Sequence, residues 1–245
     1  MRGIRIAVLR LFRRVNPGDV TIRHHWTGKP FRLHSFRHKG YWWYGRNRER
    51  ETMEMFAKLI GKNDIVWEVG AHIGYLTVFF CLLSSRVTAF EPSAENLKYL
   101  SRNAPANARI VPVAATEEEA ENVPLYTENL TGQNCSLLPD YREFDINAKL
   151  AGYTAQRSVE HVRAVSLDSY SVRTSEVPDF VKIDVEGAEL EVLRGMTRIL
   201  ADRGPRLMVE MTDRENEVVA LLGRFGYECT ARFALNTFWE KKPSA

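Results

Sequence analysis

The first candidate site is a turn in which an acid precedes two glycines. Residues 64–74 read Asp-Ile-Val-Trp-Glu-Val-Gly-Ala-His-Ile-Gly, an apolar strand that runs into a turn and then a helix. Glycines at the end of a strand let a ligand approach the backbone, and a helix N-terminus offers free N–H groups. A dinucleotide fingerprint would need glycines where His72 and Tyr75 stand, so that fingerprint fails. We expect Glu68 to accept from an ammonium group, and the amides near 71–73 to face a carboxylate.

A second acid, Glu91 in Ala-Phe-Glu-Pro, lies 23 residues beyond Glu68 at the predicted end of the next strand. An acid at about this distance in a strand–helix–strand unit accepts hydrogen bonds from both ribose hydroxyls. An ordinary surface glutamate is the alternative. An acid two residues before Gly70, followed by the Gly-x-x-x-Gly spacing of Gly70 and Gly74, is the pattern of S-adenosylmethionine sites, so the two signals together predict that ligand. Its ribose carries no 2′-phosphate, so an acid is tolerated at position 91.

The third candidate is the segment Phe-Val-Lys-Ile-Asp-Val-Glu-Gly-Ala-Glu at residues 180–189. Lys182, Asp184 and Glu186 alternate, so they share one face of the predicted strand. Open α/β sheets bind their ligands at the carboxyl ends of the strands. Three charges on a buried strand are costly unless they are paired or functional. The alternative is an ion pair from Lys182 to Asp184 or Glu186 that only holds the loop.

These three segments, with Ser-Leu-Asp at 166–168 and Met-Val-Glu-Met at 208–211, resemble the FkbM-type methyltransferases. The resemblance covers roughly residues 62–211. Two positions differ, because the family usually has Asp where Glu68 stands and Asn where His72 stands. What the resemblance implies is S-adenosylmethionine-dependent O-methylation of a hydroxyl on a sugar, glycolipid, polysaccharide or natural product.

The motifs and the resemblance together assign a role to each candidate residue. The candidates for catalysis or acceptor binding are Asp184, Glu186 and His72, and which of them is the general base stays open. Ala114 and Ala115, at the end of the third strand, are expected to line the adenine pocket. The expected cofactor-binding residues are Glu68, Gly70, Ala71, His72, Gly74, Glu91, Pro92, Ala114, Ala115 and Asp184. A metal could assist hydroxyl activation, but no ligand cluster in the sequence requires one, and no metal-binding residue is predicted.

Strands and helices alternate from residue 62 onward. Strands are expected at 64–69, 86–91, 109–114, 123–127, 162–167, 179–185 and 207–211, with a hairpin at 227–233 and 235–240. Helices are expected at 51–60, 73–84, 93–103, 188–201 and 215–224, and 131–136 is expected to be an exposed loop. Such alternation implies a parallel sheet with helices on both faces. We therefore predict an α/β, Rossmann-like class I methyltransferase fold with a mostly parallel seven-stranded sheet and a C-terminal antiparallel hairpin.

The N-terminal part is basic, and we expect residues 1–60 to form a small extension to a methyltransferase domain at 61–245. Residues 1–50 carry a balance of +11, which leaves −8 on the remainder of a chain whose total is +3. The extension is expected to contain an amphipathic helix at 4–15, a hairpin at 19–24 and 31–36, and an aromatic and basic segment at 37–50. At least two of the four aromatics at 41–44 are expected in the core, although such a segment can also stack bases or sugars.

Several questions about partners stay open. Residues 1–15 either pack on the protein or make a peripheral contact with an anionic membrane. A methyltransferase acting on nucleic acid or protein, and a non-catalytic S-adenosylmethionine-binding protein, are the alternative functions. The Asn/Asp-Pro-Pro-aromatic loop common in amino-group methylation is absent from the sequence, so a nucleic-acid partner is disfavoured. Cys81, Cys135 and Cys229 form neither a disulfide framework nor a zinc site, and we expect a cytoplasmic protein without a transmembrane helix.

Overall fold

The computed structural model describes residues 18–128, 135–139, 141, 157–211 and 214–242. Its centre is a seven-stranded sheet in the order β12-β13-β11-β10-β3-β4-β5. The strands are β3 (Ile65–Val69), β4 (Arg86–Phe90), β5 (Ala108–Val111), β10 (Phe180–Ile183), β11 (Arg206–Glu210), β12 (Tyr227–Phe233) and β13 (Asn236–Lys241). The five strands from β11 to β5 run parallel, and β13 pairs antiparallel with both β11 and β12. The predicted α/β fold, with its mostly parallel sheet and terminal hairpin, is confirmed.

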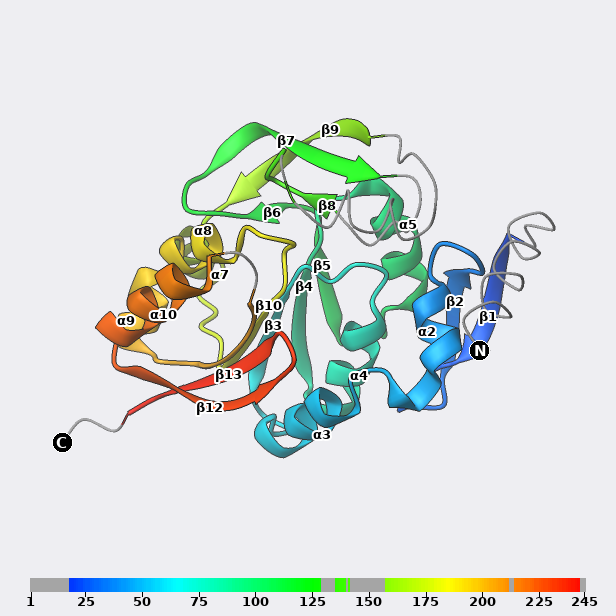
Figure 1. Cartoon of the computed structure of the whole chain (residues 1–245), viewed down its shortest axis with the longest axis horizontal. Coiled ribbons are helices and arrows are strands. Elements are labelled where there is room, and N and C mark those ends of the chain that lie inside the picture. Colours follow the sequence, from blue (N-terminus) through cyan, green and yellow to red (C-terminus); the bar gives the residue numbers. More distant parts are fainter. Residues whose placement is uncertain (1–17, 129–134, 140, 142–156, 212–213, 243–245) are drawn as a thin grey trace.

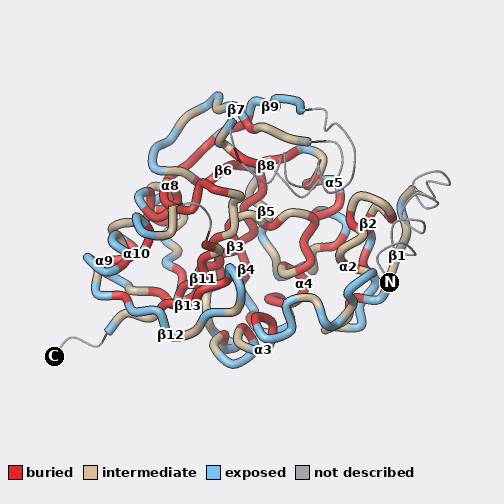
Figure 2. The backbone as a smooth tube through the Cα atoms, viewed as in Figure 1, coloured by how far each residue is buried: buried red, intermediate tan, exposed pale blue. Residues whose placement is uncertain are grey.

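Both faces of the central strands are buried, because alternate residues pack into two separate hydrophobic clusters (Figure 2). Trp67, Val181 and Leu207 face a cluster that is completed by α7 (Leu167–Thr174), α8 (Glu189–Arg194), α9 (Thr197–Asp202) and α10 (Glu215–Arg224). Val66 and Phe180 face the other cluster, completed by α3 (Arg50–Leu59), α4 (Tyr75–Leu83) and α5 (Ala94–Asn103). Figure 1 shows these two helix groups on opposite sides of the sheet. Strands buried on both faces explain why the sequence there reads as continuous apolar runs.

The N-terminal extension packs directly on the second helix group. It contains the antiparallel pair β1 (Asp19–Arg23) and β2 (Pro30–His34), the short helix α2 (Lys39–Tyr44) and the 3₁₀ turn η1 (Gly45–Asn47). Phe31 and Tyr41 belong to the same cluster as the α4 residues Tyr75 and Phe79. The Asn103 side chain joins the two parts, since its amide accepts from the Arg32 N–H and donates to the Arg32 carbonyl, both at 2.8 Å.

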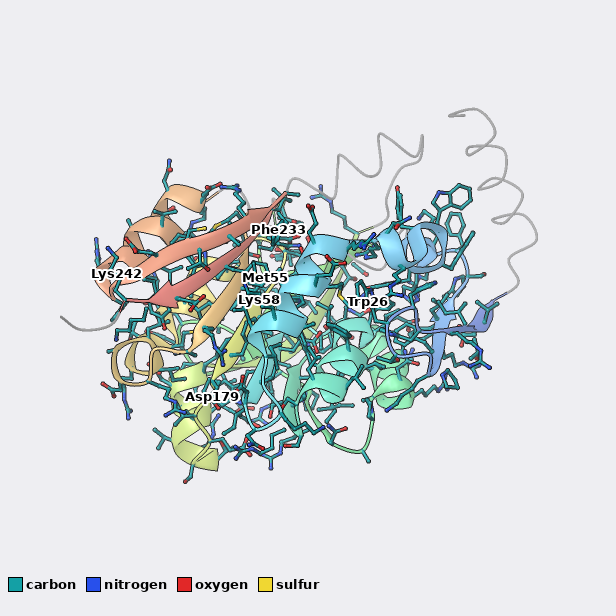
Figure 3. The ribbon with its side chains drawn as sticks, turned by 90° about the horizontal axis from the view of Figure 1, so that it is seen from below. Trp26, Met55, Lys58, Asp179, Phe233 and Lys242 are labelled. Carbon is teal, nitrogen blue, oxygen red and sulfur yellow. The ribbon has the colours of Figure 1, made fainter. Side chains whose placement is uncertain are left out.

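The aromatic segment at 41–44 has an inner and an outer side. Tyr41 is buried and Trp42 packs against the core, as expected for two of the four aromatics, whereas Trp43 and Tyr44 are exposed. The lower side of the molecule carries apolar residues from three separate parts of the chain. There Figure 3 shows Trp26 of the extension, Met55 of α3 and Phe233 of β12, each of which packs against the same cluster.

A second, four-stranded sheet lies across one end of the molecule (Figure 1). Its order is β6 (Ala114–Ala115), β9 (Arg157–Val165), β7 (Ala120–Glu128) and β8 (Cys135–Ser136). The strand expected at 162–167 therefore belongs to β9, outside the central sheet, and it ends at Val165. Ser166 then caps α7 by accepting from the Ser169 N–H at 3.2 Å. The helix α7 was not predicted from the sequence.

The single helix expected at 188–201 is two helices, and Gly195 marks the break. A Cβ at this glycine would lie 2.0 Å from the Thr116 carbonyl oxygen, so the chain approaches another backbone segment at this point. The expected helix at 4–15 and most of the expected loop at 131–136 lie outside the described residues, although Cys135 and Ser136 form β8. Within the described ranges, every helix is too short or too polar to cross a bilayer.

Candidate active site

One pocket gathers nearly all the residues that the sequence singled out. It lies at the carboxyl ends of β3, β4, β10 and β11, with further walls from the N-terminal extension and from the second sheet. Every predicted site residue lines this pocket except Gly74. Gly74 instead precedes α4 with a φ of 87°, where a Cβ would lie 2.8 Å from Leu100 Cδ1. Gly74 therefore shapes the turn, and its predicted contact with the cofactor stays a prediction.

Gly70 brings the two motif-bearing loops into direct backbone contact. Its φ is 79°, and a Cβ there would lie 1.9 Å from the Asp184 carbonyl oxygen. The Asp184 N–H in turn donates to the Val69 carbonyl at 3.2 Å. A side chain at position 70 is thus excluded both by the positive φ and by the missing space. The loops that follow β3 and β10 therefore hold one another in place.

Glu68 is a buried carboxylate at the floor of the pocket. It is 1% exposed, and its Oε2 accepts from the Thr77 hydroxyl at 2.6 Å. Burial raises the pKa of Glu68 to about 7, against the opposing effect of the Lys182 charge. A cationic ligand beside this carboxylate would favour its ionised form.

Glu91 is held rigidly at the end of β4 and is no ordinary surface glutamate. Its carboxylate accepts from the His72 N–H at 2.7 Å, the Ser93 N–H at 2.9 Å and the Asn96 amide at 3.1 Å. Burial raises its pKa, while these donors act in the opposite direction. An ionised carboxylate has about four acceptor positions, so capacity remains for a ligand hydroxyl.

The free amides expected near 71–73 are only partly available. The N–H groups of Gly70 and Ala71 both donate to the Phe90 carbonyl at 3.0 Å, and that of His72 donates to Glu91. The prediction that this run of amides faces a ligand carboxylate is therefore wrong for Ala71 and His72. Only Ile73 of the three keeps an N–H without a partner among the described residues.

Lys182 and Asp184 form the ion pair that the sequence allowed as an alternative. The Lys182 ammonium lies 3.1 Å from Asp184 and donates to the Gly70 carbonyl at 2.7 Å and the Val69 carbonyl at 3.4 Å. Although burial opposes ionisation of Asp184, the Lys182 charge holds the pKa of Asp184 below its ordinary value. The pair fixes the loop, and it also keeps an ionised carboxylate in the pocket wall.

Two further carboxyl groups flank Asp184. Burial, followed by the Asp184 charge, raises the pKa of Glu186 to about 8, and Glu186 accepts from the Tyr141 hydroxyl at 2.5 Å. The Asp184 charge, followed by burial, raises the pKa of Glu210 to about 11, so its protonated form donates to Asp184. Glu210 was not among the predicted site residues, although it ends β11, a strand whose carboxyl end lies at the pocket.

A group of three acids could also provide oxygen ligands for a hard cation, namely Asp184, Glu186 and Glu210. Their carboxylate oxygens lie within 4.8 Å of one another. Oxygen ligands in such a group suit Mg²⁺ or Ca²⁺. No such cluster was expected from the sequence, although its third member, Glu210, lies in the Met-Val-Glu-Met segment at 208–211.

His72 connects the pocket to the N-terminal extension. Its φ is 51°, a left-handed conformation that Asn and His adopt more readily than most residues. Its Nδ1 lies 3.0 Å from the Tyr41 hydroxyl, and its ring makes an edge contact with buried His38. The structure therefore shows His72 held by Tyr41, a residue that the sequence reading did not assign to the site.

The pocket lining also includes apolar side chains. Ala114 and Ala115 are buried in β6, and they line the pocket together with Phe90, Leu125 and Leu137. Apolar side chains of this kind can contact a flat aromatic base. The pocket lining thus combines apolar and acidic residues.

The comparisons with known proteins agree with these motifs. A curated hexuronic acid methyltransferase, AglP of Haloferax volcanii, is 28% identical over 155 residues, which are 62% of this chain and 58% of AglP. The methyltransferase sdnD of Sordaria araneosa is 27% identical over 195 residues, covering 69% of this chain and 75% of sdnD. The crystal structure of an FkbM methyltransferase from Methylobacillus flagellatus covers 80% of this chain and 51% of its own, with a TM-score of 0.47 and 17% identity. Residues 68–229 match the profile of the methyltransferase FkbM domain, and the chain belongs to that family.

Proposed function

We propose that this protein is an S-adenosylmethionine-dependent O-methyltransferase that acts on a hydroxyl of a sugar or a small natural product. The observation that carries the proposal is the convergence of Glu68, Glu91 and Asp184 on one pocket that apolar residues also line. These acids come from three adjacent strands of the sheet, where open α/β folds bind their ligands.

The residues present fit S-adenosylmethionine. Glu68 would accept from its ammonium group, Glu91 would accept from a ribose hydroxyl, and Ala114 and Ala115 would contact its adenine. When bound, it supplies a methyl group on a cationic sulfonium. Ionised carboxylates in the pocket wall, Asp184 among them, favour a cationic ligand over the neutral thioether that remains after transfer.

The acceptor hydroxyl needs alignment and a group that takes its proton. Asp184 is ionised and faces the pocket, but its low pKa makes it a weak base on its own. Glu186 has a pKa of about 8, close to the value that suits a general base near neutral pH. We therefore propose that Asp184 orients the acceptor hydroxyl. Glu186, whose pKa the charge of Asp184 helps to raise, would accept the proton.

The acceptor class is supported by the name of a relative. AglP is described as a hexuronic acid methyltransferase, and sdnD as a methyltransferase. A sugar hydroxyl is the acceptor that best combines this with the acidic pocket wall, because carboxylates hydrogen-bond sugar hydroxyls well.

The proposal is tested by calorimetry and an acceptor screen on the full chain. We expect S-adenosylmethionine and S-adenosylhomocysteine to bind and NADH not to bind. Release of S-adenosylhomocysteine should then appear with glycosides and uronides, and not with RNA, DNA or protein. Turnover confined to nucleic acid or protein would refute the acceptor class. S-adenosylmethionine binding without turnover on any acceptor would support a non-catalytic binding protein instead.

A further inference from the structure

The N-terminal extension places a cation in a pocket that is otherwise acidic. Among the described residues that line it, only Arg48 and Lys182 carry a permanent positive charge, beside six acids. Lys182 is 2% exposed, and two backbone carbonyls and Asp184 already surround its ammonium. Arg48 is therefore the cation that remains for a ligand.

The Arg48 side chain is positioned by its neighbours, while its hydrogen-bonding capacity is largely unused. Its guanidinium lies 4.5 Å from the centre of the Tyr41 ring, and its one ionic partner in the described part of the chain is Glu49, at 3.4 Å. Tyr41 is itself fixed by its contact with His72. A guanidinium has five N–H donors in a planar fork, and that fork matches the two oxygens of a carboxylate. The side chain is 27% exposed, so it is accessible from the pocket.

We propose that Arg48 binds a carboxylate in this pocket. An anion would be repelled by the ionised Asp184 carboxylate, so we expect a carboxylate to lie beside the Arg48 cation. The backbone offers little competition, because the amides of Ala71 and His72 are already engaged. The proposal rests on the proposed function, which supplies two sources of this group. One is the amino-acid end of S-adenosylmethionine, and the other is an acceptor that carries a carboxylate.

The first arm of the test compares S-adenosylmethionine with its decarboxylated form, which keeps the ammonium and lacks the carboxylate. Arg48→Met retains apolar contact with Tyr41 and removes the charge, Arg48→Lys keeps the charge without the fork, and Arg46→Met is the matched control. Arg46 lies two residues away, over the Trp26 ring at 4.7 Å, and does not line the pocket. If the donor is the source, Arg48→Met should bind S-adenosylmethionine about 10- to 100-fold more weakly and its decarboxylated form unchanged. Arg48→Lys should be intermediate, and Arg46→Met should match the wild type.

The second arm uses methyl glucuronide and methyl glucoside as probes in the presence of S-adenosylhomocysteine. If the acceptor is the source, Arg48→Met should bind S-adenosylmethionine normally and lose a preference for the glucuronide of about 10-fold or more. The proposal is overturned if the wild type shows neither preference, or if Arg48→Met retains whichever preference the wild type has. Circular dichroism and thermal unfolding identify a misfolded variant, and Arg48→Lys then decides the question. Absence of S-adenosylmethionine binding by the wild type would instead refute the proposed function.

Discussion

Replacing Glu68 by Gln should stabilise the ligand-free protein at alkaline pH and also weaken binding of a cationic ligand. Burial raises the pKa of Glu68 to about 7 from an ordinary value of 4.5. Each pKa unit corresponds to about 1.4 kcal/mol, so ionising this carboxyl group in the folded chain costs about 3 kcal/mol of unfolding free energy above pH 7. Glutamine has a similar shape, can accept from Thr77 and carries no charge.

The pH dependence isolates this effect from other consequences of the substitution. The folded protein holds the Glu68 proton more tightly than the unfolded chain does, so this contribution to stability is lost as the pH rises from about 4.5 to 7. Relative to the wild type, Glu68→Gln should therefore gain about 2–3 kcal/mol between pH 5 and pH 8. Wild-type affinity for S-adenosylmethionine should rise over the same upper range, as Glu68 ionises.

The measurement is urea unfolding at pH 5 and pH 8, with calorimetry for the ligand. Exposed Glu118→Gln serves as the control and should show no such gain. An equal stability difference between Glu68→Gln and the wild type at both pH values would show that Glu68 is not held as a costly buried charge. Unchanged affinity for S-adenosylmethionine in Glu68→Gln would remove it from the ligand site.

Three further outcomes follow from the site and the extension. Glu91→Ala should weaken S-adenosylmethionine binding by about 1–3 kcal/mol, since the ribose loses a charged acceptor; calorimetry showing unchanged affinity would exclude the ribose role. Asp184→Asn and Glu186→Gln should each lower turnover about 100-fold or more while S-adenosylmethionine still binds; near-normal turnover in both would return the pair to a structural role. The full-length chain should sediment with anionic vesicles, but not with neutral ones, in a salt-sensitive way, and removal of residues 1–15 should abolish this binding. A full-length chain that binds neither type of vesicle would contradict membrane docking.

The central sheet could be predicted from the sequence because its signals are local. Each parallel strand reads as an apolar run that ends in a turn, and the strands expected at 64–69, 86–91 and 207–211 lie within one residue of β3, β4 and β11. The convergence of Glu68, Glu91 and Asp184 could also be predicted, because the carboxyl ends of parallel strands meet at one edge of the sheet.

The errors arose where distant contacts decide the structure. The break at Gly195 comes from close approach to Thr116, which no local pattern reveals. The amides that were expected to be free near residue 71 donate hydrogen bonds to the Phe90 carbonyl and the Glu91 carboxylate. The positions of these acceptors depend on the neighbouring strand. Arg48 and Tyr41 reach the pocket only because the extension folds over α4. The basic and aromatic residues around them in the sequence are equally typical of a solvent-exposed surface, so the sequence did not predict this contact.

The shared core of the extension and the central sheet affects how this protein can diversify. Phe31, Leu33 and Met53 are buried in the same cluster as Val66 and Phe180, so a cut at residue 60 would expose apolar surface on both fragments. We therefore expect that recombination, natural or in the laboratory, cannot exchange the segment before residue 61 as a cassette. New acceptor preferences should instead arise through single substitutions at Arg48 and Glu49, which line the pocket outside the core that both halves share.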